Sequence, residues 1–306
     1  MKNRKLLFGL VILFLSCIGL NSVNAQTQEG WISLGPNNVS GRSRTIIFDR
    51  FNNDIMYSGG VAGGLFISVN NGKNWQEITL VDGQQNLAIT AIAQDNNGVL
   101  YVGTGEGDYL NNGFGIKNNT IGMLGNGVYK STTLNSTNKN WAEILTSDDA
   151  KYAWATENIE FELLNFTKPT SPHNYGDGKA FVNKIAVNRS SNKVYIATND
   201  GLMQLNDAAS GWTMISAIGS STVGDIISNK DGVLAVYYTD SKANVMVSSD
   251  DFNQNNNIIL TVDSIKTFDT SSTSINRIRL AFGIQNPNKI YSYVNYFSEA
   301  PEGGRY

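Results

Sequence analysis

Short apolar runs separated by turns of Asn, Asp, Ser and Gly repeat along most of this chain. The first full unit has apolar runs at residues 45–48, 55–57 and 65–67, and a polar turn leads from there to Trp75 and a run at 75–78. Runs of this length, rich in β-branched and aromatic residues and bounded by turn residues, predict β-strands. Each unit therefore predicts four short strands, and no amphipathic helix of useful length is expected between them.

The unit recurs along the chain, at about residues 41–80, 87–145, 179–216, 222–260 and, incompletely, 274–306. Equivalent positions such as Tyr57 and Tyr101 lie 44 residues apart, and Tyr195 and Ala235 lie 40 apart. A four-stranded repeat of this period is typical of a β-propeller. A sandwich or a solenoid would not explain why Trp recurs at the start of the fourth strand. We therefore predict an all-β propeller of four-stranded antiparallel blades, four complete and a fifth partial.

The two ends of the chain carry different signals. Residues 1–25 have basic residues, an apolar run at 6–20 and a small residue, Ala25, at the expected cleavage point, which predicts a secretory signal peptide. Residues 26–306 would then form the propeller. Residues 31–34 match the outer-strand pattern and are expected to close the ring in the last blade. The final Gly303-Gly304-Arg305-Tyr306 resembles the start of a third strand, so we expect a fragment of a propeller of seven or more blades.

Composition excludes several classes of function. The net charge is −3 and the pI about 5.3, and no Lys/Arg cluster follows the leader, so nucleic acid is not an expected partner. No later apolar stretch is long enough to span a bilayer, so no transmembrane segment is expected after signal cleavage. The one cysteine, Cys17, lies in the leader, and His173 is the one histidine. We therefore expect no metal and no cofactor, and an exported protein that is secreted, periplasmic or on the cell surface.

The polar turns resemble degenerate Asp-box (BNR) repeats, whose pattern is Ser-x-Asp-x-Gly-x-Thr-Trp. The positions that carry this resemblance, with Asn70 in place of Asp and Phe252 in place of Trp, are Ser68, Asn70, Gly72, Trp75, Ser131, Trp141, Trp212, Ser248, Asp250 and Phe252. The stretches 41–42, 101–106 and 127–131 resemble the sortilin-like and xyloglucan-hydrolase-like propellers of exported bacterial proteins. The resemblance implies a scaffolding role for the turn residues.

The same resemblance gives no catalytic residue. The xyloglucan-hydrolase-like family places a catalytic Asp before a Gly-Gly pair, and Val61 stands at that position here. Sialidases use an arginine triad, whereas Arg42 is a single arginine expected near the central channel. Glycoside hydrolysis needs two carboxylates that flank the bond. Catalytic residues therefore stay unassigned in the sequence.

Two insertions interrupt the repeat and mark the expected binding site. They span residues 104–126 and 145–179, and we expect both on the face opposite the Asp-box turns, with part of 159–163 forming an extra strand. The candidate ligand-binding residues are Arg42, Glu106, Asp108, Tyr109, Trp154, Glu157 and Tyr175. Carboxylates and flat rings bind sugars, so the leading hypothesis is a non-catalytic propeller that binds a glycan or an extracellular protein. The alternatives are a glycoside hydrolase completed by later blades, and a structural module of a large cell-surface protein.

Overall fold

The computed structural model describes residues 42–61, 63–80, 88–105, 125–135, 137–164, 181–206, 211–239, 243–253, 258–261 and 273–298. The chain divides into two compact units, residues 1–34 and 35–306, and every described residue belongs to the second. The expected leader, the segment 31–34 and the last residues, 303–306, lie outside the described residues.

The first two sheets each contain four antiparallel strands. Sheet one consists of β1 (Ser43–Phe48), β2 (Met56–Gly60), β3 (Gly64–Ser68) and β4 (Gln76–Ile78). Sheet two consists of β5 (Ile89–Gln94), β6 (Leu100–Thr104), β7 (Val128–Ser131) and β8 (Phe161–Leu164).

The next two sheets have the same order, and a two-stranded sheet follows them. Sheet three consists of β9 (Val182–Val187), β10 (Val194–Thr198), β11 (Gly201–Leu205) and β12 (Trp212–Met214). Sheet four consists of β13 (Thr222–Ser228), β14 (Leu234–Thr239), β15 (Ala243–Ser248) and β16 (Ile258–Thr261). Sheet five pairs β17 (Thr273–Phe282) with β18 (Ile290–Ser298). The prediction of an all-β propeller with four full blades and a partial fifth is confirmed.

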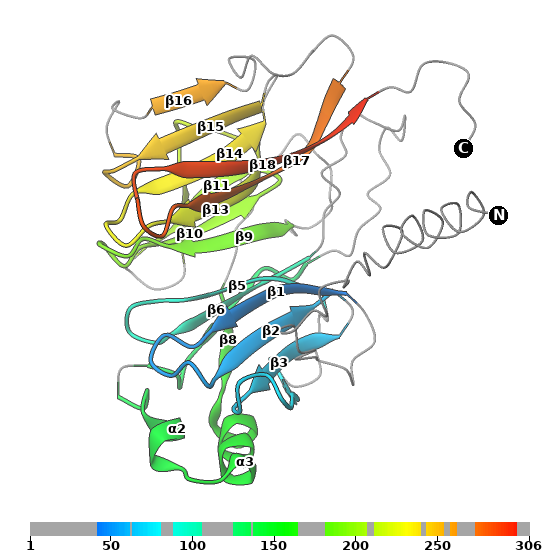
Figure 1. The fold of residues 1–306 in the computed structure, drawn as a ribbon, viewed down its shortest axis with the longest axis vertical. Coiled ribbons are helices and arrows are strands. Elements are labelled where there is room, and N and C mark those ends of the chain that lie inside the picture. Colours follow the sequence, from blue (N-terminus) through cyan, green and yellow to red (C-terminus); the bar gives the residue numbers. More distant parts are fainter. Residues whose placement is uncertain are drawn as a thin grey trace, which may run out of the picture. The chain divides into compact units, whose positions relative to one another are not determined.

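The first strands of successive sheets lie next to one another, from β1 through β5, β9 and β13 to β17 (Figure 1). A hydrophobic cluster fills each junction between consecutive sheets. In β5, Ile92 packs toward sheet one, whereas Ala91 and Ala93 pack toward sheet three. Both faces of a middle sheet are therefore covered, which explains why β5 is buried throughout rather than alternating.

The turns after the first strands of sheets one to four also join the sheets. In four of these turns an Asp or Asn oxygen accepts backbone N–H groups of the same turn, and the four residues are Asp49, Asp95, Asn188 and Asn229. Such side chains stabilise turns because they satisfy backbone donors locally. Their remaining atoms reach neighbouring sheets: Gln94 Nε2 donates to Asp49 Oδ2 at 2.8 Å, and Asn188 Nδ2 donates to the Gly232 carbonyl at 2.9 Å. The polar turns thus help to fix one sheet against the next.

Sheet two departs from the predicted strand order. The predicted fourth strand at 141–144 is wrong, because Trp141–Ile144 forms the short helix α2 and a second helix, α3 (Asp148–Asn158), follows it. The outer strand is β8, in the segment expected to be an extra strand. The Ser147 hydroxyl accepts the Ala150 N–H at 3.2 Å, and Asp148 and Asp149 occupy the first turn, which are favourable features of a helix start. Helix α3 is 11 residues long and its one buried residue is Ala155, so it is a helix without an apolar stripe at a place where no helix was expected.

Candidate functional site: the helical insertion of sheet two

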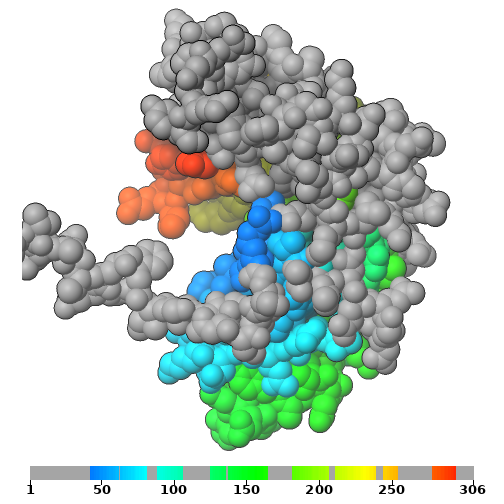
Figure 2. Space-filling view, turned by 90° about the vertical axis from the view of Figure 1, so that its right-hand side faces the viewer, coloured from blue at the N-terminus to red at the C-terminus, as the bar shows by residue number. Residues whose placement is uncertain are grey.

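The insertion connects β7 to β8, the third and fourth strands of sheet two. This position determines on which side of the propeller the insertion lies. In an antiparallel blade, the connection between strands three and four emerges on the same side as the equivalent connection of the next blade. The insertion therefore belongs beside the β3–β4 turn of sheet one, and Figure 2 shows residues 141–164 packed against that sheet. The prediction that Trp154 and Glu157 lie on the face opposite these turns is wrong. It failed because residues 141–144 were assigned to the outer strand.

The β3–β4 turn is closed by its own side chains. Ser68 Oγ accepts the Gly72 N–H at 2.8 Å, and Asn70 Oδ1 accepts the Asn74 N–H at 3.0 Å. The Trp75 indole N–H donates to the Gly72 carbonyl at 3.0 Å. Gly72 has φ +79°, a conformation that glycine adopts without a steric penalty. The turn therefore gives the insertion a fixed polar surface on which to dock.

Helix α3 docks on this turn through specific hydrogen bonds. The Tyr152 hydroxyl donates to the Asn74 carbonyl at 2.7 Å, and Asn70 Nδ2 donates to Asp148 Oδ2 at 3.0 Å. The Val69 N–H also points at the Tyr152 oxygen, at 3.4 Å. Burial is the main cause that raises the pKa of the Tyr152 hydroxyl, which keeps it a neutral donor. The helix is thus held to sheet one at both of its first two turns.

Two tryptophans form the base of the insertion. The rings of Trp141 and Trp154 stack with centroids 4.5 Å apart and an interplanar angle of 13°. Trp141 is only 5% exposed, whereas Trp154 is half-buried. Both pack against the cluster between sheets one and two. Trp154 therefore has a structural role on the ring face toward Trp141, and keeps part of its surface open to solvent.

The surface of the insertion and of β8 is strongly acidic. Its exposed carboxylates are Glu143, Asp148, Asp149, Glu157, Glu160 and Glu162. Two exposed apolar side chains lie among them in the sequence, Ile144 at 75% and Leu163 at 42% exposure. On a helix, residues three apart are neighbours, so Trp154 and Glu157 lie on the same face of α3. This arrangement can accept hydrogen bonds and offer a flat apolar contact at one place.

Of the other predicted binding residues, the structure describes Arg42 alone. Arg42 is exposed just before β1, and its carbonyl accepts the Val61 N–H at 3.0 Å, so it belongs to the opposite side of sheet one. Glu106, Asp108, Tyr109 and Tyr175 lie outside the described residues, as does His173. Within the described ranges, no three His, Cys, Asp or Glu side chains gather as a metal site. Among the same residues, no helix is both long and apolar enough to cross a membrane.

The turn of sheet four corrects the role expected for Phe252. Its backbone N–H donates to Ser248 Oγ at 2.9 Å, the bond that Gly72 makes to Ser68, and its φ is +62°. Phe252 thus stands at the glycine position of the turn and not at the tryptophan position. Its ring packs edge-to-face on Tyr195, 5.8 Å between centroids. The strained backbone places a buried ring between sheets three and four, and burial of that ring offsets the strain.

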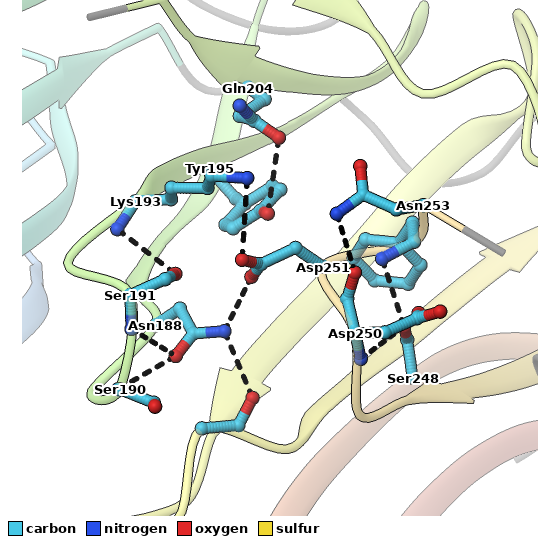
Figure 3. Close-up of polar contacts among 12 residues, drawn as sticks. Asn188, Ser190, Ser191, Lys193, Tyr195, Gln204, Ser248, Asp250, Asp251 and Asn253 are labelled. Carbon is cyan, nitrogen blue, oxygen red and sulfur yellow. Dashed lines mark hydrogen bonds and ion pairs between the residues drawn. The ribbon is translucent and has the colours of Figure 1, made fainter.

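Asp251 joins the same two sheets (Figure 3). Its carboxylate accepts a hydrogen bond from Asn188 Nδ2 and pairs with Lys193 Nζ at 3.4 Å. In the same turn the Ser248 hydroxyl donates to Asp250 Oδ1 at 2.9 Å. The remaining turn positions are structural too: Ser131 Oγ accepts the Leu100 N–H at 2.9 Å, and Trp212 opens β12 half-buried. These contacts show a scaffold and offer no ligand site.

Comparison with known proteins agrees with the fold. Residues 83–106 match the family model described as "Two component regulator propeller". No curated protein matches the chain. Among solved structures, the extracellular domain of a putative one component system from B. thetaiotaomicron superposes with a TM-score of 0.51 at 15% identity, over 83% of this chain and 26% of that one.

Two glycoside hydrolases are also similar in structure. The GH74 xyloglucanase from Xanthomonas campestris gives a TM-score of 0.49 at 13% identity, over 85% of this chain and 36% of that one. An ancestral GH74 enzyme gives 0.48 at 14% identity, over 84% of this chain and 32% of that one. The chain therefore spans about a third or less of these proteins. At such identities the fold alone is shared, and this chain has the β-propeller fold.

Proposed function

We propose that residues 26–306 form a non-catalytic, ligand-binding propeller module of an exported protein, with residues 1–25 as its export signal. We also infer that its turns are Asp-box repeats. The hydrogen bonds of Ser68, Gly72 and Trp75, and the matching bond of Ser248 to Phe252, support that inference. The ligand that we propose is a glycan of an extracellular surface.

One observation carries this proposal, and it is the docked insertion of sheet two. Function in a rigid repeat scaffold concentrates where a connection is lengthened. Here the lengthened connection is held in place, because Tyr152 and Asp148 form hydrogen bonds with the β3–β4 turn of sheet one. It carries the half-buried Trp154 and the exposed Glu157 on the same face of α3. A flat ring that packs on a sugar face, next to an acceptor for hydroxyl groups, suits a glycan.

The alternative function is that of a glycoside hydrolase, which requires catalytic carboxylates in addition to a binding surface. That reaction needs an acid and a second carboxylate on either side of the scissile bond. Val61 stands where the xyloglucan-hydrolase-like family places one of them. A hydrolase would therefore have to take its carboxylates from other segments. Incubation with xyloglucan separates the two functions, because a binding module releases no reducing ends.

A glycan array tests the binding proposal. We expect the exported form, residues 26–306, to bind a defined set of glycans, and Glu157→Gln to lose at least tenfold in affinity with an unchanged melting temperature. Glu77→Gln is the matched control, because Glu77 is also exposed but lies on β4, outside the insertion. Tyr109→Ala tests the other inserted loop in the same way. Equal binding by wild type and Glu157→Gln would place the ligand elsewhere.

A further inference from the structure

Asn70 belongs to the β3–β4 turn of sheet one and also contacts the insertion. Its Oδ1 atom accepts the Asn74 N–H at 3.0 Å and the Ser68 hydroxyl at 3.2 Å. The Asn74 N–H can only donate, so it fixes which end of the amide is the oxygen. The Nδ2 group then donates to Asp148 Oδ2 at 3.0 Å, at the start of α3. One side chain therefore closes the turn and holds the helix.

Sheet four has the same kind of turn with a carboxylate at this position (Figure 3). There Asp250 Oδ1 accepts the Ser248 hydroxyl at 2.9 Å, as Asn70 Oδ1 accepts that of Ser68. The backbone N–H groups of Asn70 and Asp250 also donate to the serine oxygen of their own turns, both at 3.4 Å. A carboxylate and an amide therefore close this turn alike, and the turn by itself does not explain the amide in sheet one.

The docked helix does explain the amide. Both helices of the described ranges belong to the insertion of sheet two, and α3 begins with Asp148 and Asp149. A carboxylate at position 70 would face Asp148 Oδ2 with a second acceptor and a second negative charge. Two such groups at hydrogen-bond distance repel each other, whereas an amide N–H and a carboxylate attract. Position 70 therefore needs an acceptor for its own turn and a donor for the neighbouring sheet.

We propose that Asn70 is a positioning residue of the ligand-binding surface, where its amide holds the first turn of α3 and thereby places Trp154 and Glu157. Asn70 does not touch the ligand. That this surface binds a glycan rests on the proposed function, whereas the hold of Asn70 on α3 does not. Tyr152 bonds the second turn of the same helix to the Asn74 carbonyl at 2.7 Å. Loss of the Asn70 contact should therefore loosen the start of α3 and leave the helix attached.

The variant Asn70→Asp tests this role, because it keeps the size of the side chain and the acceptor of the turn. We expect hydrogen exchange in α3 to become at least threefold faster and the signals on the glycan array to weaken at least threefold, since attraction at one contact is replaced by repulsion. The melting temperature should stay close to that of wild type. Asp250→Asn is the matched control: it makes the reverse exchange in the turn of sheet four and should change neither α3 nor binding.

A double variant separates positioning from a merely structural effect on the turn. Asn70→Asp combined with Asp148→Asn moves the donor to the helix and the acceptor to the turn, so exchange in α3 and the array signals should return to wild-type values. Unchanged exchange in Asn70→Asp, or a defect that Asp148→Asn does not repair, would overturn the proposal. Faster exchange with undiminished array signals would overturn the role in binding. If wild type binds no glycan, the proposed function fails, and the exchange rates still decide whether Asn70 positions α3.

Discussion

The β3–β4 and β7–β8 connections occupy the same place in neighbouring sheets and are built differently. The first is a compact turn that Ser68 and Asn70 close with side-chain hydrogen bonds. The second spans residues 132–160 and contains α2 and α3. Each nevertheless buries a tryptophan: Trp75 is 8% exposed and Trp141 is 5% exposed.

The difference shows that the buried tryptophan and the start of the outer strand are two separate features, which the repeat pattern in the sequence places together. In sheet one, Trp75 directly precedes β4, so anchor and outer strand coincide. In sheet two, Trp141 begins a helix, and the outer strand does not start until Phe161. In sheet two the tryptophan therefore marks a buried anchor and not the start of a strand. A sheet can lengthen this connection as long as the anchor stays in place.

Substitution of the anchors gives the largest expected effect. Trp141→Ala should lower the free energy of unfolding by about 3–5 kcal/mol, because a buried indole is lost and Trp154 loses its stacking partner. Trp75→Ala should cost less within that range, since Trp75 packs in a small cluster with Met56 and Phe66. Urea denaturation measures both. A loss under 1 kcal/mol in Trp141→Ala would show that the insertion is not anchored by this ring.

Most of the fold was predictable from sequence, because it rests on local signals that repeat. Four of the five first strands were recognised from apolar runs and turn residues, and the fifth from the same pattern in incomplete form. Helix α3 was not recognised, because its one fully buried residue is Ala155 and no apolar stripe runs along it. The cap at Ser147, followed by two aspartates, was the signal that could have found it.

The site was less predictable than the fold. Trp154 and Glu157 were recognised as candidates. The side of the propeller on which they lie depends on which segment pairs with β7, and strand pairing is a non-local property that the sequence does not reveal. The hydrogen bond from Tyr152 to the Asn74 carbonyl joins residues 78 apart, and no sequence pattern encodes it.

Removal of the Tyr152 hydroxyl tests the docking of the insertion directly. Tyr152→Phe keeps the ring and loses the bond to the Asn74 carbonyl, so we expect a cost of about 1 kcal/mol. Hydrogen exchange in α3 should become faster, while exchange in β2 and β3 should not change. Tyr291→Phe is the control, because Tyr291 is exposed on β18. Unchanged exchange in α3 would mean that the stacked tryptophans alone hold the insertion.

Raising the pH should give the smallest change in stability, and it tests the hydrogen bond from Tyr152 to the Asn74 carbonyl directly. Burial raises the pKa of Tyr152 above its ordinary value of 10.0, so the folded protein keeps the proton at a pH where the unfolded chain has lost it. The stability that the hydroxyl contributes is therefore complete below about pH 10 and is lost as pH rises through the folded pKa. Other buried tyrosines, such as Tyr57, titrate in both proteins, so their contributions cancel in the stability difference between the two.

The stability difference between wild type and Tyr152→Phe should thus be constant from pH 7 to 9 and shrink above pH 10, as measured by urea denaturation at each pH. A difference that stays constant up to pH 11 would show that the hydroxyl is hydrated in the folded protein and does not bond to the turn.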